Sequence, residues 1–294
     1  MSAGGIAPSV DTARDAARIT RRARRRRRSR FMTAITATAT ALALVPLVSI
    51  VAYLLARGGR ALTPTFFTHA PAAAGQAGGG IANAIAGTLL LAAMASALGV
   101  PLGIGAGLYL AERRGTRRAA TVRYLADVLA GVPSVVFGIA AWQLLVRPVG
   151  HFSALAGGLA LGALAIPLVA RATEAVLHLT PSSLTDAALA LGFPRWRTAL
   201  TVVLRGALPG VATAALIAVA RVAGETAPLL FTAFGNQYWS LRPDQPIAAL
   251  PLQVFSYAMS PDDGWRRQAY GGAVVLVALV ALLTLAGRVA RRRA

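Results

Sequence analysis

The stretch TPSSLTDAALALGFPRWR, residues 180–197, lies between two long apolar segments and is the most informative part of the chain. Its helix-capping and helix-breaking residues predict a short helix with defined ends, at about residues 183–192. Ser183 is a candidate N-cap, and Asp186 follows it three positions later, which approximates a capping box. Gly192 supplies a left-handed helix terminus, and the proline two residues beyond it prevents the helix from continuing.

The predicted helix has one apolar face. Its apolar residues recur at positions i, i+3, i+4 and i+7, which are Leu184, Ala187, Ala188 and Leu191. A helix of about two turns is marginal on its own and needs a partner surface. We therefore expect this smooth face to dock either on the chain's own membrane domain or on another protein.

On both sides of this loop the chain consists of apolar stretches of roughly 20 residues or more, each long enough to cross about 30 Å of hydrocarbon as a helix. They predict an all-α membrane protein with six transmembrane helices. The second stretch contains several glycines and Pro101, so we expect it to kink or to pack closely against a neighbour. The six stretches are Phe31–Ala56, Ile81–Ala111, Tyr124–Val146, Ser153–Ala170, Ala207–Phe234 and Gly271–Arg288.

The charge of the chain is distributed unevenly around these stretches. Hydrophobic residues make up 56% of the 294, and the formal net charge is +20, carried by arginine alone. About 23 of the 30 arginines fall on one side of the predicted membrane, which places both termini in the cytoplasm by the positive-inside rule.

Residues 1–30 carry ten arginines and no apolar periodicity, and we expect a disordered cytoplasmic tail before a membrane domain at 31–294. Since its arginine run directly precedes an apolar stretch, anionic lipid is a better partner for it than nucleic acid.

Missing residue types exclude several kinds of chemistry. The chain has no cysteine, and its three histidines are far apart, so we expect no disulfide, thiolate catalysis or metal site. A phosphate-cradling loop of the form G-x-x-x-x-G-K-[ST] needs a lysine, and the chain has none. We therefore expect no cofactor on this chain, and if transport uses ATP, the ATPase must be another polypeptide.

The loop resembles the one shared by importer-type ABC permeases, written E-A-A-x-x-x-G with a later I-x-L-P. The matching residues are Asp186-Ala-Ala, Gly192, Val202 and Leu204, with Asp186 in place of Glu and Arg205 in place of Pro. The resemblance implies the MetI-like type I fold of binding-protein-dependent inner-membrane transport components. It also implies that the short helix docks in a groove of the ATPase, through Asp186, Ala187, Ala188, Leu191 and Gly192.

Further strings resemble the phosphate (PstA-type) branch of these permeases over roughly residues 80–290. They are Pro101-Leu-Gly with Tyr109-Leu-Ala-Glu112, Leu125 to Ser134 with Phe137-Gly138, and Gly224-Glu-Thr-Ala-Pro-Leu-Leu-Phe231. This resemblance implies import of inorganic phosphate across the cytoplasmic membrane. The implied partners are a homologous permease, two ATPase subunits that use the ATP, and an external phosphate-binding protein.

Two charged residues stand out in the fifth apolar stretch, Arg221 and Glu225. A charge within a membrane span costs roughly 2.5 kcal/mol or more on insertion scales, so such residues are candidates for function. Their i, i+4 spacing allows them to share a helix face and pair. Either the pair only fixes helix packing, or Arg221 faces the pathway and meets a phosphate oxyanion while Glu225 holds it. Asp127 could organise the inner mouth or cap the third helix.

Other functions are consistent with parts of the sequence. An ABC permease for molybdate or sulfate would share the loop, but the string at 224–231 disfavours it. A secondary transporter or channel could use Arg221 and Glu225 to relay ions, but it leaves the bounded helix at 183–192 unexplained. A membrane-embedded enzyme is disfavoured because the chain lacks clustered catalytic groups.

Overall fold

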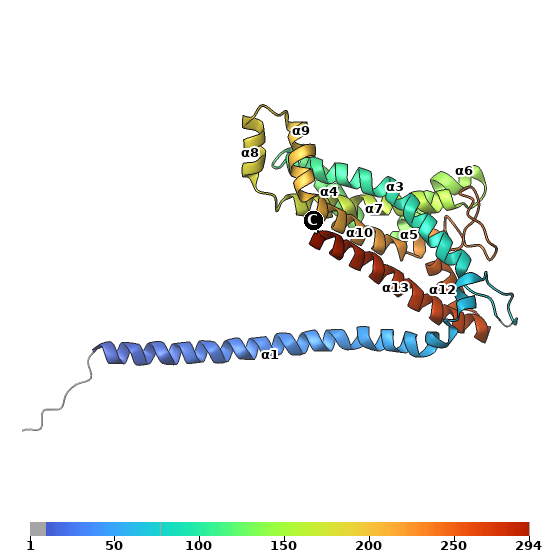
Figure 1. The fold of residues 1–294 in the computed structure, drawn as a ribbon, viewed down its shortest axis with the longest axis horizontal. Coiled ribbons are helices and arrows are strands. Elements are labelled where there is room, and N and C mark those ends of the chain that lie inside the picture. Colours follow the sequence, from blue (N-terminus) through green and yellow to red (C-terminus); the bar gives the residue numbers. More distant parts are fainter. Residues whose placement is uncertain (1–9, 77, 294) are drawn as a thin grey trace, which may run out of the picture. The chain divides into compact units, whose positions relative to one another are not determined.

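A computed structural model describes residues 10–76 and 78–293 of the chain, with side chains for 28–76 and 78–289. All regular elements in this part are helices (Figure 1). The α-helices are α1 (Val10–Gly58), α2 (Pro64–Thr68), α3 (Ala82–Glu112), α4 (Arg117–Gly131), α5 (Ser134–Ala141), α6 (Arg147–Val149), α7 (Ala154–Leu177), α8 (Ser182–Ala190), α9 (Arg195–Thr198), α10 (Arg205–Ala223), α11 (Ala227–Leu230), α12 (Leu250–Ala258) and α13 (Asp263–Arg293). A 3₁₀ turn, Gly59–Ala61, follows α1, and π-helical turns at Trp142–Val146 and Ala199–Leu204 precede α6 and α10.

The chain divides into two compact units, residues 1–53 and 54–294. The first unit holds most of helix α1, whose apolar span begins at Arg28. Residues 10–30, for which a disordered tail was expected, have a helical backbone at the start of α1, in keeping with the high helix propensity of alanine and arginine. Residues 1–9 of the predicted tail lie outside the described part of the chain.

Five helical segments of the described chain are long and apolar enough to cross a membrane, and a bent pair makes a sixth if it is counted as one span. This agrees with the six predicted stretches, judged by length and composition. The six spans are Arg28–Ala61, Ala82–Glu112, the pair Arg117–Gly131 with Ser134–Val149, Ala154–Leu177, Arg195–Ala223 and Asp263–Val289.

Two of the predicted spans differ from the observed ones because of proline. The third was expected to be a single helix but is bent by 96° between α4 and α5, where Pro133 disfavours helical geometry at Val132. The fifth was expected to run to Phe234 but ends at Ala223. A longer helix would need an N–H at Pro228 to donate to the carbonyl of Gly224, and proline has none.

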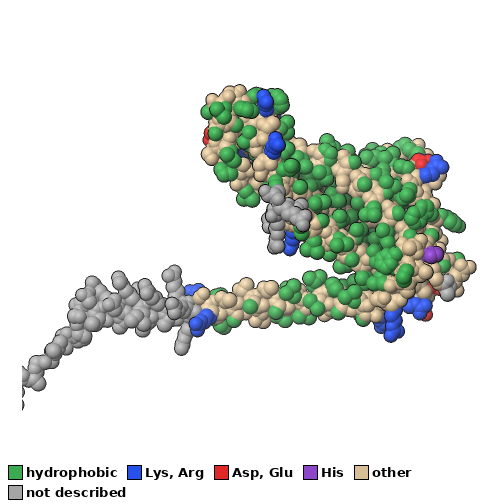
Figure 2. All heavy atoms as spheres, in the orientation of Figure 1, with side chains coloured by type: hydrophobic (Ala, Val, Ile, Leu, Met, Phe, Trp, Pro, Cys, Tyr) green, Lys and Arg blue, Asp and Glu red, His purple; other side chains and the backbone are tan. Residues whose placement is uncertain are grey.

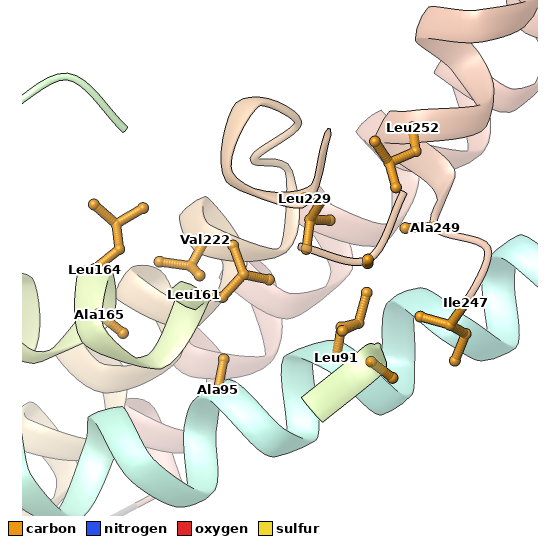
Figure 3. Close-up of a cluster of buried hydrophobic side chains, with 12 residues drawn as sticks. Leu91, Ala95, Leu161, Leu164, Ala165, Val222, Leu229, Ile247, Ala249 and Leu252 are labelled. Atoms are coloured by element: carbon orange, nitrogen blue, oxygen red, sulfur yellow. The ribbon is translucent and has the colours of Figure 1, made fainter. Parts of the chain in front are cut away.

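Helices α3 and α7 lie side by side through a row of glycines (Figure 1). Gly99, Gly103 and Gly107 are one turn apart, and their buried face meets Ala165, Val169 and Thr173 of α7. At the end of this contact, side chains from α3, α7, α10, α11 and α12 form one apolar core (Figure 3). The second apolar stretch is thus one continuous helix whose small residues serve close packing.

This packing predicts a difference between two glycines of α3. A Cβ added at Gly103 would lie 2.5 Å from Cβ of Val169, whereas one added at Gly105 would meet nothing within 4 Å. Gly103→Ala is therefore expected to destabilise the protein by about 1–3 kcal/mol through overpacking. Gly105→Ala is the matched control, and it should leave the unfolding temperature in detergent unchanged or slightly raised. Equal unfolding temperatures for the two variants would contradict this account of the α3–α7 contact.

Candidate functional site

Helix α8 lies in the loop between α7 and α9, as the sequence predicted, but it begins slightly earlier. It runs from Ser182 to Ala190 after Pro181, so Ser183 is inside the first turn and is not the N-cap. Gly192 adopts the expected left-handed conformation, with φ = 84°. The N–H of Phe193 donates to the carbonyl of Ala188 at 3.2 Å, which turns the chain back towards α9.

The apolar face of α8 is only partly exposed. Leu184 and Leu191 are 48% and 78% exposed, and Ala187 is also exposed. Ala188 is only 6% exposed, and its carbonyl accepts the hydrogen bond from Phe193 in the turn towards α9. Ala188 is therefore not part of the exposed face in this chain, although helical spacing groups it with the other three residues. The exposed face consists of Leu184, Ala187 and Leu191, with the exposed carboxylate of Asp186 beside them.

Beneath α8 is a cavity of about 310 Å³ between α8, α9 and the end of α3. Two acids and two arginines line it, namely Glu112, Asp186, Arg114 and Arg195. These charges balance, so the cavity has no net sign that would favour an anion or a cation. It leaves space between α8 and the membrane helices.

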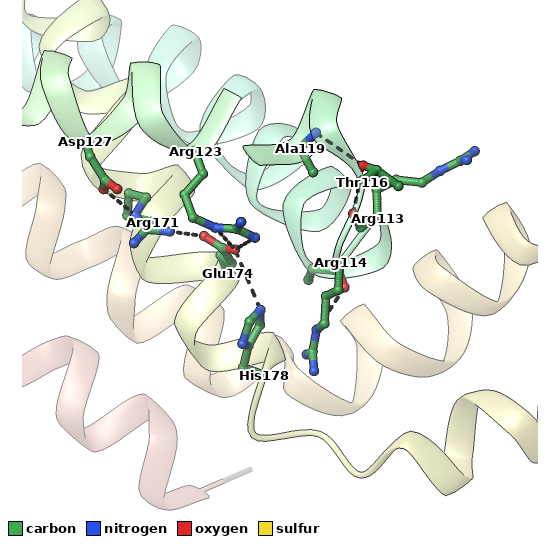
Figure 4. A network of polar contacts seen from close by, with 10 residues as sticks. Arg113, Arg114, Thr116, Ala119, Arg123, Asp127, Arg171, Glu174 and His178 are labelled. Carbon is green, nitrogen blue, oxygen red and sulfur yellow. Dashed lines mark hydrogen bonds and ion pairs between the residues drawn. The ribbon is translucent and has the colours of Figure 1, made fainter. Parts of the chain in front are cut away.

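An ion network lies where α7 leads into this loop (Figure 4). Its centre is Glu174 of α7, which is only 1% exposed. The guanidinium of Arg123, from α4, donates to Oε1 of Glu174 from Nε at 2.9 Å and from Nη2 at 2.6 Å. Arg171 donates to Oε2 of the same carboxylate, and its Nε lies 2.7 Å from Oδ1 of Asp127 on α4. Two arginines and two acids thus join the middle of α4 to the last two turns of α7.

His178 lies beside this network, just beyond the end of α7. Its Nε2 is 3.7 Å from Oε1 of Glu174. Burial, followed by the nearby guanidinium of Arg114, lowers the pKa of His178 below its ordinary value. The lowered pKa favours the neutral imidazole at neutral pH.

Sequence reasoning did not single out this network. It considered Asp127 as a helix cap or a residue of the inner mouth, but Asp127 lies inside α4 and pairs with Arg171. The available signal was a pair of charged positions, Arg171 and Glu174, at i, i+3 next to an apolar run. The partner on α4, Arg123, is 51 residues away in sequence and could not be assigned from spacing alone.

Arg221 and Glu225 do not form the predicted pair. The i, i+4 geometry requires a continuous helix, and α10 ends at Ala223, between the two residues. Arg221 is exposed in the last turn of α10, and Glu225 is half-buried in the segment after it. The ion pairs found in the described part of the chain do not join them.

Residues 99–293 match the family model described as binding-protein-dependent transport system inner membrane component. A phosphate transport system permease protein PstA of Yersinia pestis is 43% identical over 244 residues, covering 83% of each chain. The protein of that name from Xylella fastidiosa is 46% identical over 212 residues, covering 71% of this chain and 74% of its own.

A more distant relative and one solved structure complete the comparison. The phosphate transport system permease protein PstA 1 of Mycobacterium tuberculosis is 36% identical over 254 residues, covering 85% of this chain and 84% of its own in one strain. The solved structure of an inward-facing MetNI methionine ABC transporter superposes with a TM-score of 0.59 at 24% identity, covering 72% of this chain and 96% of that chain. This last likeness concerns the fold.

Proposed function

This chain belongs to the family of binding-protein-dependent transport system inner membrane components, and from that premise we propose that it is the permease subunit of an ATP-driven importer of inorganic phosphate. The observation that carries the proposal is the similarity to phosphate permeases across most of the chain. The chain is a multi-pass protein of the cytoplasmic membrane with an ABC-permease fold. The ATP is used by a partner ATPase.

The exposed face of α8 is the proposed point of contact with the ATPase. Leu184, Ala187 and Leu191 offer an apolar surface at the tip of the loop, with Asp186 beside it. Two short elements join α8 to the membrane helices, the turn after α7 and the turn at Gly192. A movement of α8 is therefore transmitted to α7 and α10, and through Glu174 to α4.

The proposed assembly contains a homologous permease, two ATPase subunits and an external phosphate-binding protein. ATP binding draws the ATPases together and moves α8, and the membrane helices then alternate access between the two sides. Most of the specificity for phosphate resides in the binding protein, so the permease is a conduit of low affinity.

Arg221 is the proposed contact for the anion, because an arginine offers positive potential and fork-like donors to an oxyanion. Glu225 is proposed to line the same part of the translocation pathway, although it does not form an ion pair with Arg221.

The docking role of α8 is best tested at Leu191, the most exposed of its leucines. Leu191→Asp is expected to weaken co-purification of the ATPase at least about tenfold and to abolish uptake, since it places a charge in an apolar contact. Membrane levels should stay normal, because Leu191 makes little contact within the chain. A bulky residue at Ala188 would be less informative, because it would first disturb the chain's own packing.

The matched control for this test is Leu241→Asp, which changes an exposed leucine outside the loop. It should leave ATPase co-purification at the level of the unaltered chain. Normal co-purification with Leu191→Asp would remove α8 from the ATPase contact.

The substrate is tested separately by deleting the gene and measuring uptake of phosphate, sulfate and molybdate under limitation for each ion. Loss of phosphate uptake alone is the expected result. If sulfate or molybdate uptake is lost while phosphate uptake continues, the chain is a permease for that other oxyanion.

A further inference from the structure

A second cavity lies at the other end of the membrane helices, where α1 ends and α13 begins. Its volume is about 590 Å³, within the range of about 300–1,000 Å³ that small-molecule sites occupy. Three arginines line it, Arg57, Arg60 and Arg267, and no carboxylate is among the described lining residues. Figure 2 shows basic side chains gathered at this end of α1. The cavity is thus strongly positive, unlike the balanced cavity beneath α8.

The concentration of arginine here is unusual for this side of the chain. Only about six of the 30 arginines fall on the side predicted to face outwards, and three of them line this one cavity. Of the other three, Arg242 pairs with Asp244 and Arg266 with Asp263. The ion pairs of the described residues do not include Arg60 or Arg267. Arg267 lies near Asp263, so part of its charge is balanced, but three guanidinium groups that converge on one cavity still give it a net positive charge that attracts an anion.

The remaining lining groups suit the oxygen atoms of a phosphoryl group. The hydroxyls of Thr63 and Thr65 lie 2.8 Å apart and can share one hydrogen bond, which leaves a second hydroxyl proton to donate. The amide of Gln76 adds further donors. Guanidinium groups bind phosphoryl oxygens in a bidentate manner, and hydroxyl and amide donors complete such sites.

The position of the cavity also favours a phosphoryl group. The helical segment that contains the first apolar window ends at Ala61, and the segment that contains the last one begins at Asp263. By length and composition, the cavity is therefore expected at the edge of the hydrocarbon layer, near the headgroups. Phe66 and Tyr270 are also among the lining residues. A lipid headgroup would fill more of 590 Å³ than a free phosphate ion would.

We propose that Arg57, Arg60 and Arg267 form a phosphoryl-group site at this interface, which takes the headgroup of an anionic phospholipid or a free phosphate ion. The site goes beyond the proposed transport function and does not depend on it. Bound there, an anionic headgroup would hold the end of α1 to the start of α13. A free phosphate ion would instead mark a second anion contact, separate from Arg221.

The test uses the full chain purified in a neutral detergent and followed by native mass spectrometry. The probes are dioctanoyl phosphatidylglycerol, zwitterionic dioctanoyl phosphatidylcholine and inorganic phosphate. The double variant Arg60→Gln/Arg267→Gln is expected to weaken binding at least about tenfold, since each charge-assisted hydrogen bond to a phosphoryl oxygen is strong. Phosphatidylcholine should bind weakly to the unaltered chain, because its ammonium group repels arginine.

The matched control is Arg147→Gln, which removes an exposed arginine on the same predicted side that does not line the cavity. It should leave binding unchanged. Loss of phosphatidylglycerol binding in the double variant alone assigns the site to lipid, and the same pattern with inorganic phosphate assigns it to the free ion. The proposal is overturned if neither probe binds, if phosphatidylcholine binds equally well, or if the double variant binds like the control. Equal unfolding temperatures without ligand show that the double variant is folded.

Discussion

Replacing Arg221 with glutamine is expected to abolish phosphate uptake while the protein remains in the membrane at normal levels. Arg221 is exposed in the last turn of α10 and is free of the predicted partner Glu225, so its loss leaves no buried acid without a counter-charge. Glutamine keeps hydrogen-bonding capacity but removes the positive charge that attracts an oxyanion. The measurement is radiolabelled phosphate uptake in cells that carry only the altered gene, with membrane levels followed by immunoblot.

Two further variants make this result specific. Arg205→Gln removes an exposed arginine from the other end of the same helix and should leave uptake near normal. Arg221→Lys keeps the charge but lacks the fork geometry and should retain partial uptake. Normal uptake with Arg221→Gln would remove Arg221 from the pathway.

The second large effect is expected at Glu174, the centre of the ion network. Glu174→Gln leaves the guanidinium groups of Arg123 and Arg171 facing each other without a shared carboxylate. Breaking a buried pair costs about 3–5 kcal/mol, and the lower end of this range applies because the two arginine side chains are 30% and 36% exposed. We therefore expect a lower unfolding temperature and a smaller amount of protein in the membrane.

Glu112→Gln is the matched control for Glu174, because Glu112 is an exposed glutamate at the end of α3. Its unfolding temperature should equal that of the unaltered chain. The double variant Arg123→Gln/Glu174→Gln should recover part of the loss, since it removes Arg123, which Glu174→Gln leaves without its carboxylate partner, while Arg171 keeps Asp127. If Glu174→Gln unfolds at the same temperature as Glu112→Gln, the network does not stabilise the contact between α4 and α7.

The number of spans and the position of α8 could be predicted from the sequence for related reasons. Hydropathy over about 20 residues averages out local detail, and a helix bounded by proline and glycine carries its own end signals. The errors have local causes. Pro133 and Pro228 lie within runs that remain apolar on average, so hydropathy does not reveal the breaks at these prolines. The third span was therefore predicted to be straight, and the fifth was predicted to continue beyond its actual end at Ala223. Pro181, directly before α8, is its N-cap, two residues before the predicted cap Ser183.

The contacts between distant segments were beyond reach of sequence patterns. Ala188 is buried within the chain, which helical spacing could not distinguish from the exposure of its neighbours on the same face. Glu174 and its partner Arg123 come from two helices that spacing does not relate. Arg221 and Glu225 show the opposite failure, since a spacing that suits a pair was interrupted by the end of α10.

The most direct test of the proposed function is ATP-dependent phosphate uptake into sealed proteoliposomes. The vesicles would hold this chain with its partner permease and ATPase subunits, with the phosphate-binding protein and radiolabelled phosphate outside and with or without ATP inside. We predict accumulation above the external concentration only when ATP is enclosed, and none when this chain carries Leu191→Asp. Accumulation without ATP, driven by an ion gradient alone, would contradict the account and indicate a secondary transporter.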